Sequence, residues 1–127
     1  MNNHERNKTL RIGNYVLWQG KIVEVISIMP RWVCVRDDEV TFSRSYEEFQ
    51  PVPITEEWLK EFGFEPDSIT GIYVKWKRGT FAIWQAVNEQ TFLLDNIKNK
   101  KVYLKYVHKL QNCHYELEGE ELKRKEF

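Results

Sequence analysis

Four short runs of apolar and β-branched residues alternate with turn residues over the first third of the chain. The runs are NYVLW, KIVEVISI, RWVCV and VTF, a composition typical of β-strands. Between the first two runs, Gln19-Gly20 can close a tight hairpin, since a glycine at the second turn position permits positive φ. Pro30 ends the second strand because proline has no N–H to donate to a sheet ladder. The RDDE segment then turns the chain before the fourth strand.

These strands predict an N-terminal β subdomain at about residues 9–50. Four short strands joined by tight turns resemble the start of a small SH3-like barrel of the Tudor or KOW kind, or a strongly bent antiparallel sheet. An open sheet covered on one side is equally compatible with the pattern. Together with the helices predicted below, the fold class is α+β.

The segment PVPITEEWLKEFGF carries the strongest local signals in the chain and predicts a helix at about residues 55–63. Thr55 can cap the helix, and the two glutamates that follow it place negative charge where the helix dipole favours it. Gly63 supplies the left-handed stop. Trp58, Leu59 and Phe62 recur at steps of three and four residues, so the helix has one apolar face to dock.

The segment YVKWKRGTFAIW, residues 73–84, combines three cations with four aromatic rings. A two-residue turn at Arg78-Gly79 places Trp76 opposite Phe81 in a hairpin. That register puts both rings, with Val74 and Ile83, on the core side. The outward side then carries the residues that alternate with these, namely Tyr73, Lys75, Lys77, Thr80, Ala82 and Trp84.

The rest of the chain predicts two further strands and a helix. TFLLD and KVYLKYV read as strands, and KYVHKLQNCHYELEG reads as an amphipathic helix that ends at Gly119. Its face toward the core carries Val107, Leu110, His114 and Leu117. The β-meander and this helix span about residues 70–119, and the charged tail 120–127 is expected to fray.

Composition bounds the class of protein. A chain of 127 residues predicts a single domain, residues 1–127, and five Trp, six Tyr and seven Phe argue against disorder. No segment approaches the roughly 18 uninterrupted apolar residues of a membrane span, and MNNHERNKTL lacks the apolar core of a signal peptide. We therefore expect a soluble, cytoplasmic protein. Cys34 and Cys113 are expected to be reduced packing thiols.

The zero net charge conceals an uneven distribution along the chain. Residues 1–70 carry 8 Lys+Arg against 12 Asp+Glu, residues 71–110 carry 8 against 2, and residues 111–127 carry 3 against 5. A basic middle segment therefore lies between acidic flanks, which bears on the choice of partner.

Arrangements that carry catalysis or bind metal do not emerge from the sequence. His4, His108 and His114 lack the close ligand pairs of a structural zinc site, and the expected alternative is a histidine packed at the helix edge. Cys34, placed among alternating apolar residues, is expected to be buried. The acidic cluster at residues 37–39 is typical of a strand connector. We therefore predict a protein that is not an enzyme, without catalytic residues, cofactor or metal.

Three segments, in order along the chain, carry a family resemblance. LRIGNYVLWQGKIVEV, PVPITEEWLKEFGF and KYVHKLQNCHYELEGEEL are similar to the shared blocks of small uncharacterised proteins encoded in phages and prophages of Bacteroidetes. The blocks cover somewhat under half of the chain. In the last block this sequence departs from its relatives, with Lys109 where Gln is common and CHY where an apolar or aromatic pair is common. The resemblance implies a non-catalytic accessory protein of phage origin, acting in the host cytoplasm.

Two functions follow as hypotheses. Small phage proteins often block a host machine, so the resemblance implies binding to a host protein or ribonucleoprotein, for example inhibition of an RNA-guided CRISPR effector. The alternative is an RNA or single-stranded nucleic-acid-binding module, because the basic segment interleaves lysines with rings such as Tyr103 and Tyr106. The predicted contact residues for a protein partner are Tyr73, Lys75, Lys77, Arg78, Trp84, Lys100 and Lys101. The nucleic-acid hypothesis uses the wider basic and aromatic surface of residues 71–110, which also contains Lys98, Lys105 and Lys109.

Overall fold

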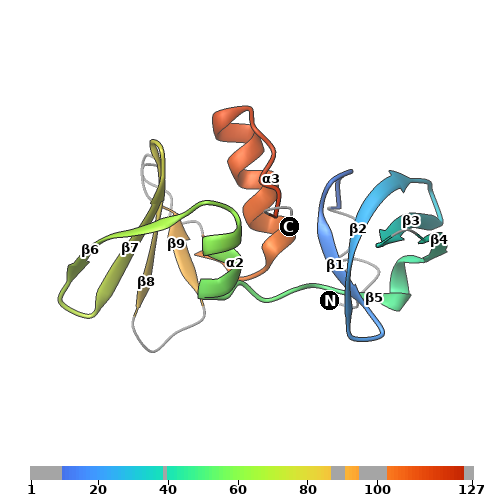
Figure 1. The fold of residues 1–127 in the computed structure, drawn as a ribbon, viewed down its shortest axis with the longest axis horizontal. Coiled ribbons are helices and arrows are strands. Elements are labelled where there is room, and N and C mark those ends of the chain that lie inside the picture. The colour runs from blue at the N-terminus through green and yellow to red at the C-terminus, as the bar shows by residue number, and fades with distance from the viewer. Residues whose placement is uncertain (1–9, 39, 87–90, 95–102, 125–127) are drawn as a thin grey trace. The chain divides into compact units, whose positions relative to one another are not determined.

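The computed structural model describes residues 10–38, 40–86, 91–94 and 103–124, which fall into two units (Figure 1). The first unit contains the described residues up to Val52 together with Tyr106–Asn112. The second contains Pro53–Lys105, as far as these are described, and the chain from Cys113 onward. The single domain expected from the chain length stays a prediction.

The first unit is a strongly bent antiparallel sheet of five strands in the order β4-β3-β2-β1-β5. Trp18 and Phe42 come from β1 and β4, which are not neighbours in this order, yet their ring centroids lie 4.7 Å apart. The sheet therefore curls over its own face. The α+β class with a bent sheet is confirmed. The strands are β1 (Tyr15–Trp18), β2 (Lys21–Ile28), β3 (Trp32–Asp37), β4 (Val40–Ser45) and β5 (Phe49–Gln50), and a 3₁₀ turn, η1 (Tyr46–Glu48), precedes β5.

Turn chemistry explains the hairpins of this sheet. Gln19 and Gly20 have φ of 48° and 81°, the two positive values of a type I′ turn, which confirms the predicted β1–β2 hairpin. Asp38 has φ of 53° after β3, so the RDDE turn is confirmed as well. A bulge between Val25 and Ser27 bends β2. The inner face is a cluster of buried side chains that includes Val16, Val23, Val25, Val33, Val35 and Phe49.

The second unit contains an antiparallel meander of five strands in the order β10-β9-β8-β7-β6. Its strands are β6 (Glu65–Thr70), β7 (Tyr73–Arg78), β8 (Phe81–Ala86), β9 (Phe92–Leu94) and β10 (Tyr103–Leu104). Strand β6 was not predicted from the sequence, and it contains Pro66. It is an edge strand with a bulge between Pro66 and Ser68, and both features tolerate a proline.

The register of the β7–β8 hairpin differs from the predicted one. Arg78 pairs with Phe81, and Trp76 pairs with Ile83 rather than with Phe81. Gly79 has φ of 61° and is the first of the two turn residues, which matches a type II′ turn. The prediction had placed Gly79 second. Because the register moves by two residues, each side chain keeps its predicted face.

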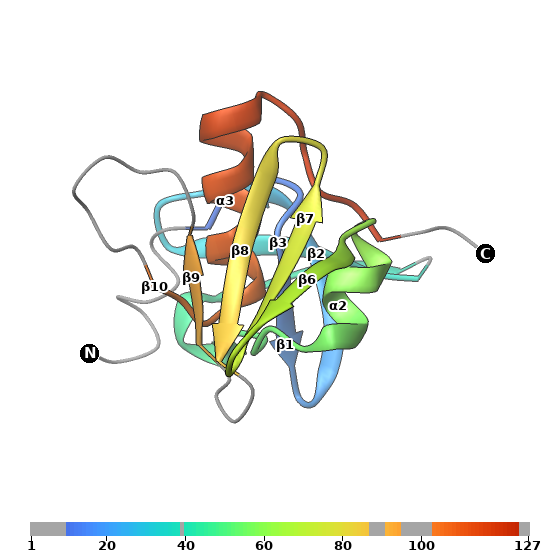
Figure 2. The ribbon, with the colours of Figure 1, turned by 90° about the vertical axis from the view of Figure 1, so that its left-hand side faces the viewer.

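Helix α2 (Glu56–Glu61) forms as its local signals predict. The Thr55 hydroxyl accepts a hydrogen bond from the Trp58 N–H at 3.3 Å, and Gly63 has φ of 88° just beyond the helix. Leu59 and Phe62 are buried. In Figure 2 the helix lies behind the second sheet, on the side where the sheet buries its apolar residues.

Helix α3 (Val107–Glu118) ends at Gly119, which has φ of 74°. Val107, Leu110 and His114 are buried as predicted, whereas Leu117 is exposed. Beyond the helix, Leu122 is fully buried, so the described part of the tail packs and does not fray. The predicted fraying overlooked a single leucine among charged residues. Neither described helix can cross a bilayer, because α2 has six residues and α3 twelve, against about 20 for a span.

Candidate binding face on the second sheet

The two faces of the second sheet have different environments. Alternate residues of its strands point toward α2 and the core, and Trp76, Phe81, Ile83, Phe92, Leu94 and Leu104 are all buried there. The core prediction for Trp76, Phe81 and Ile83 is confirmed, and Val74, at the sheet end, is half-buried. Figure 2 looks onto the opposite face, with β6, β7, β8 and β9 side by side in front. We call this opposite face the outer face.

A row of side chains crosses the outer face from one edge of the sheet to the other. Strand pairing aligns Tyr103 with Leu93, Leu93 with Trp84, Trp84 with Lys75, and Lys75 with Ser68. Residues directly opposite one another in adjacent strands point to the same side, about 5 Å apart. The sequence therefore places three large apolar side chains in succession on the solvent side of a sheet. On a sheet face exposed to water, polar residues normally occupy such positions.

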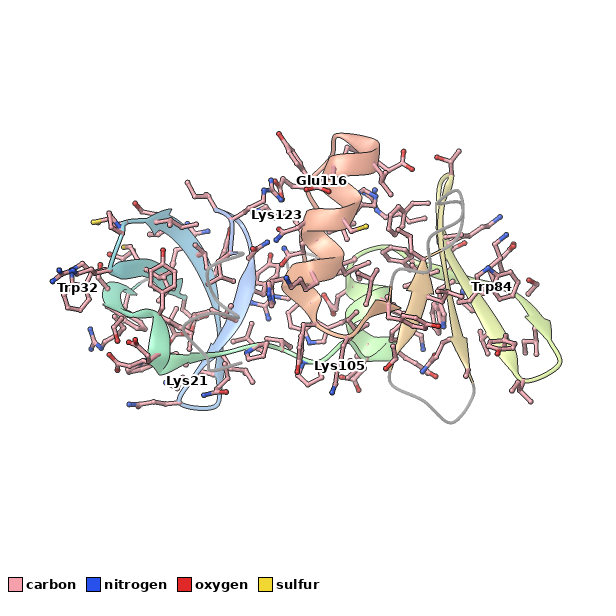
Figure 3. All side chains as sticks on the ribbon, turned by 180° about the vertical axis from the view of Figure 1, so that it is seen from behind. Lys21, Trp32, Trp84, Lys105, Glu116 and Lys123 are labelled. Carbon is pink, nitrogen blue, oxygen red and sulfur yellow. The ribbon has the colours of Figure 1, made fainter. Side chains whose placement is uncertain are left out.

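Two aromatic rings of this face are open to a partner, and a third is half-open. Tyr103 is 62% exposed and Tyr73 is 46% exposed. Trp84, which projects from β8 (Figure 3), is half-buried, and the Lys75 ammonium lies 5.4 Å from its ring centroid. This distance is within the range of a cation–π interaction, so Lys75 partly covers Trp84. The predicted outward orientation of Tyr73, Lys75 and Trp84 is confirmed.

The described part of the outer face is nearly neutral. Lys77 is exposed, but its ammonium lies 3.1 Å from a carboxylate oxygen of Asp67. Glu65 pairs with Lys77 across β6 and β7, so it lies on the same side. Two lysines therefore face two carboxylates. Lys100 and Lys101 lie outside the described residues, and so does Lys98.

Arg78 occupies a different place from the other predicted contact residues. It alternates with Lys77 and points to the inner side, where it is half-buried. Its Nε donates to the Phe62 carbonyl at 3.0 Å, and NH1 donates to Glu120 at 3.1 Å. NH1 also lies 3.3 Å from His114 Nε2. The structure therefore gives Arg78 partners that tie together the end of α2 and the chain after α3.

His114 completes this tie. Its Nδ1 lies 2.9 Å from the Glu120 carbonyl oxygen, which can only accept a hydrogen bond. Nδ1 therefore carries the proton, and Nε2 is left to accept from Arg78. The ring of Phe81 packs edge-on against the same imidazole, with centroids 4.9 Å apart. Sequence reasoning identified His114 as a core residue but had no signal for its partners, which are distant in sequence.

The histidines and cysteines of the described residues are buried or half-buried. Burial, and secondarily the charge of Lys109, lowers the pKa of His108 to about 4, so this buried imidazole is neutral at physiological pH. Burial, and secondarily the charge of Glu116, raises the pKa of the Cys113 thiol, which keeps it protonated. His108 is buried, whereas the sequence predicted a histidine packed at the helix edge. Cys34 is half-buried, because its neighbours Val33 and Val35 take the core positions of β3.

The residues missed by sequence reasoning have recognisable signals. Leu93 belongs to the outer row because it alternates with the buried Phe92 and Leu94, a pattern already visible in TFLLD. Tyr106, which the sequence grouped with the binding rings, stacks against His108 in the first unit at 6.2 Å between centroids. Within the described residues, no three His, Cys, Asp or Glu side chains gather as a metal site would require.

Comparison of the chain with protein-family models, with curated proteins and with solved structures finds no match.

Proposed function

We propose that this chain is a non-catalytic binding protein whose contact surface is the outer face of the second sheet. The observation that carries the proposal is the row formed by Tyr103, Leu93 and Trp84. The inner face of the same sheet already supplies the core of this unit. The stability of the fold therefore gives no reason for large apolar side chains on the outer face, whereas a partner that covers them does.

A protein partner fits the outer face best. Tryptophan and tyrosine are the usual anchors of protein interfaces, and Tyr73, Trp84 and Tyr103 supply them here. In the described part of the face, two lysines and two carboxylates suit a partner of mixed charge. A partner recognised mainly through its phosphates would favour an uncompensated basic surface instead.

Single-stranded nucleic acid is the second candidate. It is favoured by the placement of three rings on the solvent side of one sheet, where unpaired bases can stack. Tyr73 and Trp84 are diagonal neighbours on adjacent strands, and Tyr103 lies two strands beyond Trp84. Neighbouring strands are about 4.8 Å apart, so two strands separate Trp84 and Tyr103 by about 10 Å. Bases splayed along an extended strand can reach rings at such separations.

The first unit is proposed to be an SH3-like barrel of the Tudor or KOW kind. Three features support this finer assignment. Strand β1 pairs with both β2 and β5, a 3₁₀ turn immediately precedes β5, and the rings of Trp18 and Phe42 meet across the curled sheet. Small barrels of this kind are commonly binding modules, an argument by analogy of fold.

Phage origin and a role against host defence are proposed from the three sequence blocks that resemble phage and prophage proteins of Bacteroidetes. In this proposal the protein acts in the bacterial cytoplasm and binds a host protein or ribonucleoprotein, for example an RNA-guided CRISPR effector. The buried or half-buried state of His108, His114, Cys34 and Cys113 is compatible with a function that needs no catalyst.

Affinity purification from cells of a Bacteroidetes host tests the proposal when both protein and RNA are identified in the eluate. We expect a host protein that still co-purifies with the chain after nuclease treatment. The same protein should not co-purify with the double variant Tyr73→Ala, Trp84→Ala. An eluate that contains only RNA, with a steep loss of binding as salt rises, would support the nucleic-acid candidate instead. Recovery of the same proteins by the double variant would refute the assignment of the outer face.

A further inference from the structure

Within the described residues the two sheets have four edge strands, and three of these strands are poor templates for pairing with another strand. Strands β5 and β10 are only two residues long. Strand β6 is interrupted by Pro66 and a bulge, both of which blunt an edge. Strand β4 is different: it has six residues, contains no proline, and pairs with β3 in an unbroken register from Val40 to Ser45 (Figure 1).

The backbone groups on the free edge of β4 follow from the hairpin that joins it to β3. Asp37 and Val40 flank a two-residue turn, so they form a hydrogen-bonded pair, and every second residue of β4 then bonds to β3. Thr41 and Ser43 fall between these residues and direct their N–H and C=O groups to the free edge. In agreement, the Arg44 guanidinium donates a hydrogen bond to the Ser43 carbonyl at 2.8 Å.

We propose that two copies of this chain associate through their β4 strands, antiparallel and centred on Ser43. This register is self-complementary. It sets Thr41 opposite Ser45 of the second copy, so small hydroxyl residues meet on one face. On the other face it sets Arg44 opposite Phe42, and Arg44 already lies 5.0 Å from its own Phe42 ring centroid. Arg44, the only charged residue of β4, therefore does not lie opposite Arg44 of the second copy.

Exposed apolar residues lie at both ends of β4. Val40, at the start of the strand, is 63% exposed. Beyond its other end, the Tyr46 hydroxyl donates to the Met29 carbonyl at 2.9 Å, which places the exposed β2–β3 turn there. That turn carries Met29 and Trp32, and Trp32 is 50% exposed and projects from the first sheet (Figure 3). Antiparallel pairing places Val40 of one copy at that end of the other, on the Phe42 face of the strand, whereas Trp32 pairs with Ser45 and lies on the Ser43 face.

Sedimentation equilibrium of the full chain over a range of concentrations tests the proposal. We expect a reversible dimer of twice the 15.4 kDa chain mass. Because Ser43 lies opposite its own copy, Ser43→Lys and Ser43→Glu each place like charges in contact and should each raise the dissociation constant at least about tenfold. An equimolar mixture of the two variants should recover the dimer, since lysine then faces glutamate.

Controls separate loss of pairing from loss of folding. Ser43→Ala keeps the backbone groups and should remain a dimer, and circular dichroism of all three variants should match that of the original chain. A chain that stays monomeric at every concentration would overturn the proposal. So would a mixture of the lysine and glutamate variants that fails to associate. None of these results depends on the outer face of the second sheet, so this proposal and the proposed function can fail separately.

Discussion

Gln111 gives the sharpest test of how the first unit is held together. This side chain of α3 is fully buried, and its amide hydrogen-bonds to backbone groups of the segment before β1 and the first residue of β1. Its Oε1 accepts from the Tyr15 N–H at 3.0 Å, and its Nε2 donates to the Gly13 carbonyl at 2.9 Å. Gln111→Leu keeps an apolar side chain of similar size but leaves both backbone groups buried without these bonds.

The magnitude follows from those two groups. A buried donor or acceptor that loses its partner costs about 1–3 kcal/mol. Two such groups predict a loss of about 2–6 kcal/mol in the free energy of unfolding, a large share of the about 5–15 kcal/mol typical of a native domain. The added hydrophobic burial of leucine offsets little of this, because glutamine already buries its methylene groups at the same place.

Urea unfolding followed by circular dichroism measures the change. Lys109→Leu, an exposed substitution on the same helix, is the matched control and should change the free energy of unfolding by less than about 0.5 kcal/mol. If Gln111→Leu were no more destabilising than this control, Gln111 would not be the partner that holds the Gly13–Tyr15 segment.

The remaining predictions concern pH and the hairpin. The pKa of His108 falls from 6.5 to about 4 on folding, so the unfolded chain binds a proton at a higher pH than the folded chain does. The free energy of unfolding should therefore decline between about pH 6.5 and 4, by up to about 3 kcal/mol relative to His108→Gln. Urea unfolding at each pH measures this decline. Trp76→Ala should destabilise by about 3–5 kcal/mol as a core truncation, while charge reversal of Lys75 and Lys77 should cost less than about 1 kcal/mol; the opposite order would place the hairpin faces the wrong way round.

Local signals predicted the parts of the fold that depend on neighbours in sequence. The Thr55 cap, the Gln19-Gly20 turn and the alternation of faces in residues 73–84 each follow from a few adjacent residues, and each is confirmed. The hairpin register was wrong by two residues, because a glycine serves either position of a tight turn and only the pairing of whole strands decides between them.

Features that depend on distant residues could not be predicted. Gln111 and Arg78 are positioned by partners far along the chain, and no local pattern marks either side chain as a structural tie. Leu122 looks like an isolated leucine in a charged tail until its burial is known. The outer row was predicted only in part, because Leu93 and Tyr103 join Trp84 through the order of the strands and not through sequence spacing.

The proposed function places partner binding on the outer face of the second sheet. The most direct test takes the partner that co-purifies with the original chain and measures its affinity for two variants. One variant is Trp84→Ala on that face, and the other is Leu117→Ala at an exposed position on α3. We predict that Trp84→Ala weakens binding by at least about thirtyfold, as expected of an interface anchor worth about 2 kcal/mol, while Leu117→Ala binds normally. Equal affinity of Trp84→Ala and the original chain, with both folded, would contradict the claim.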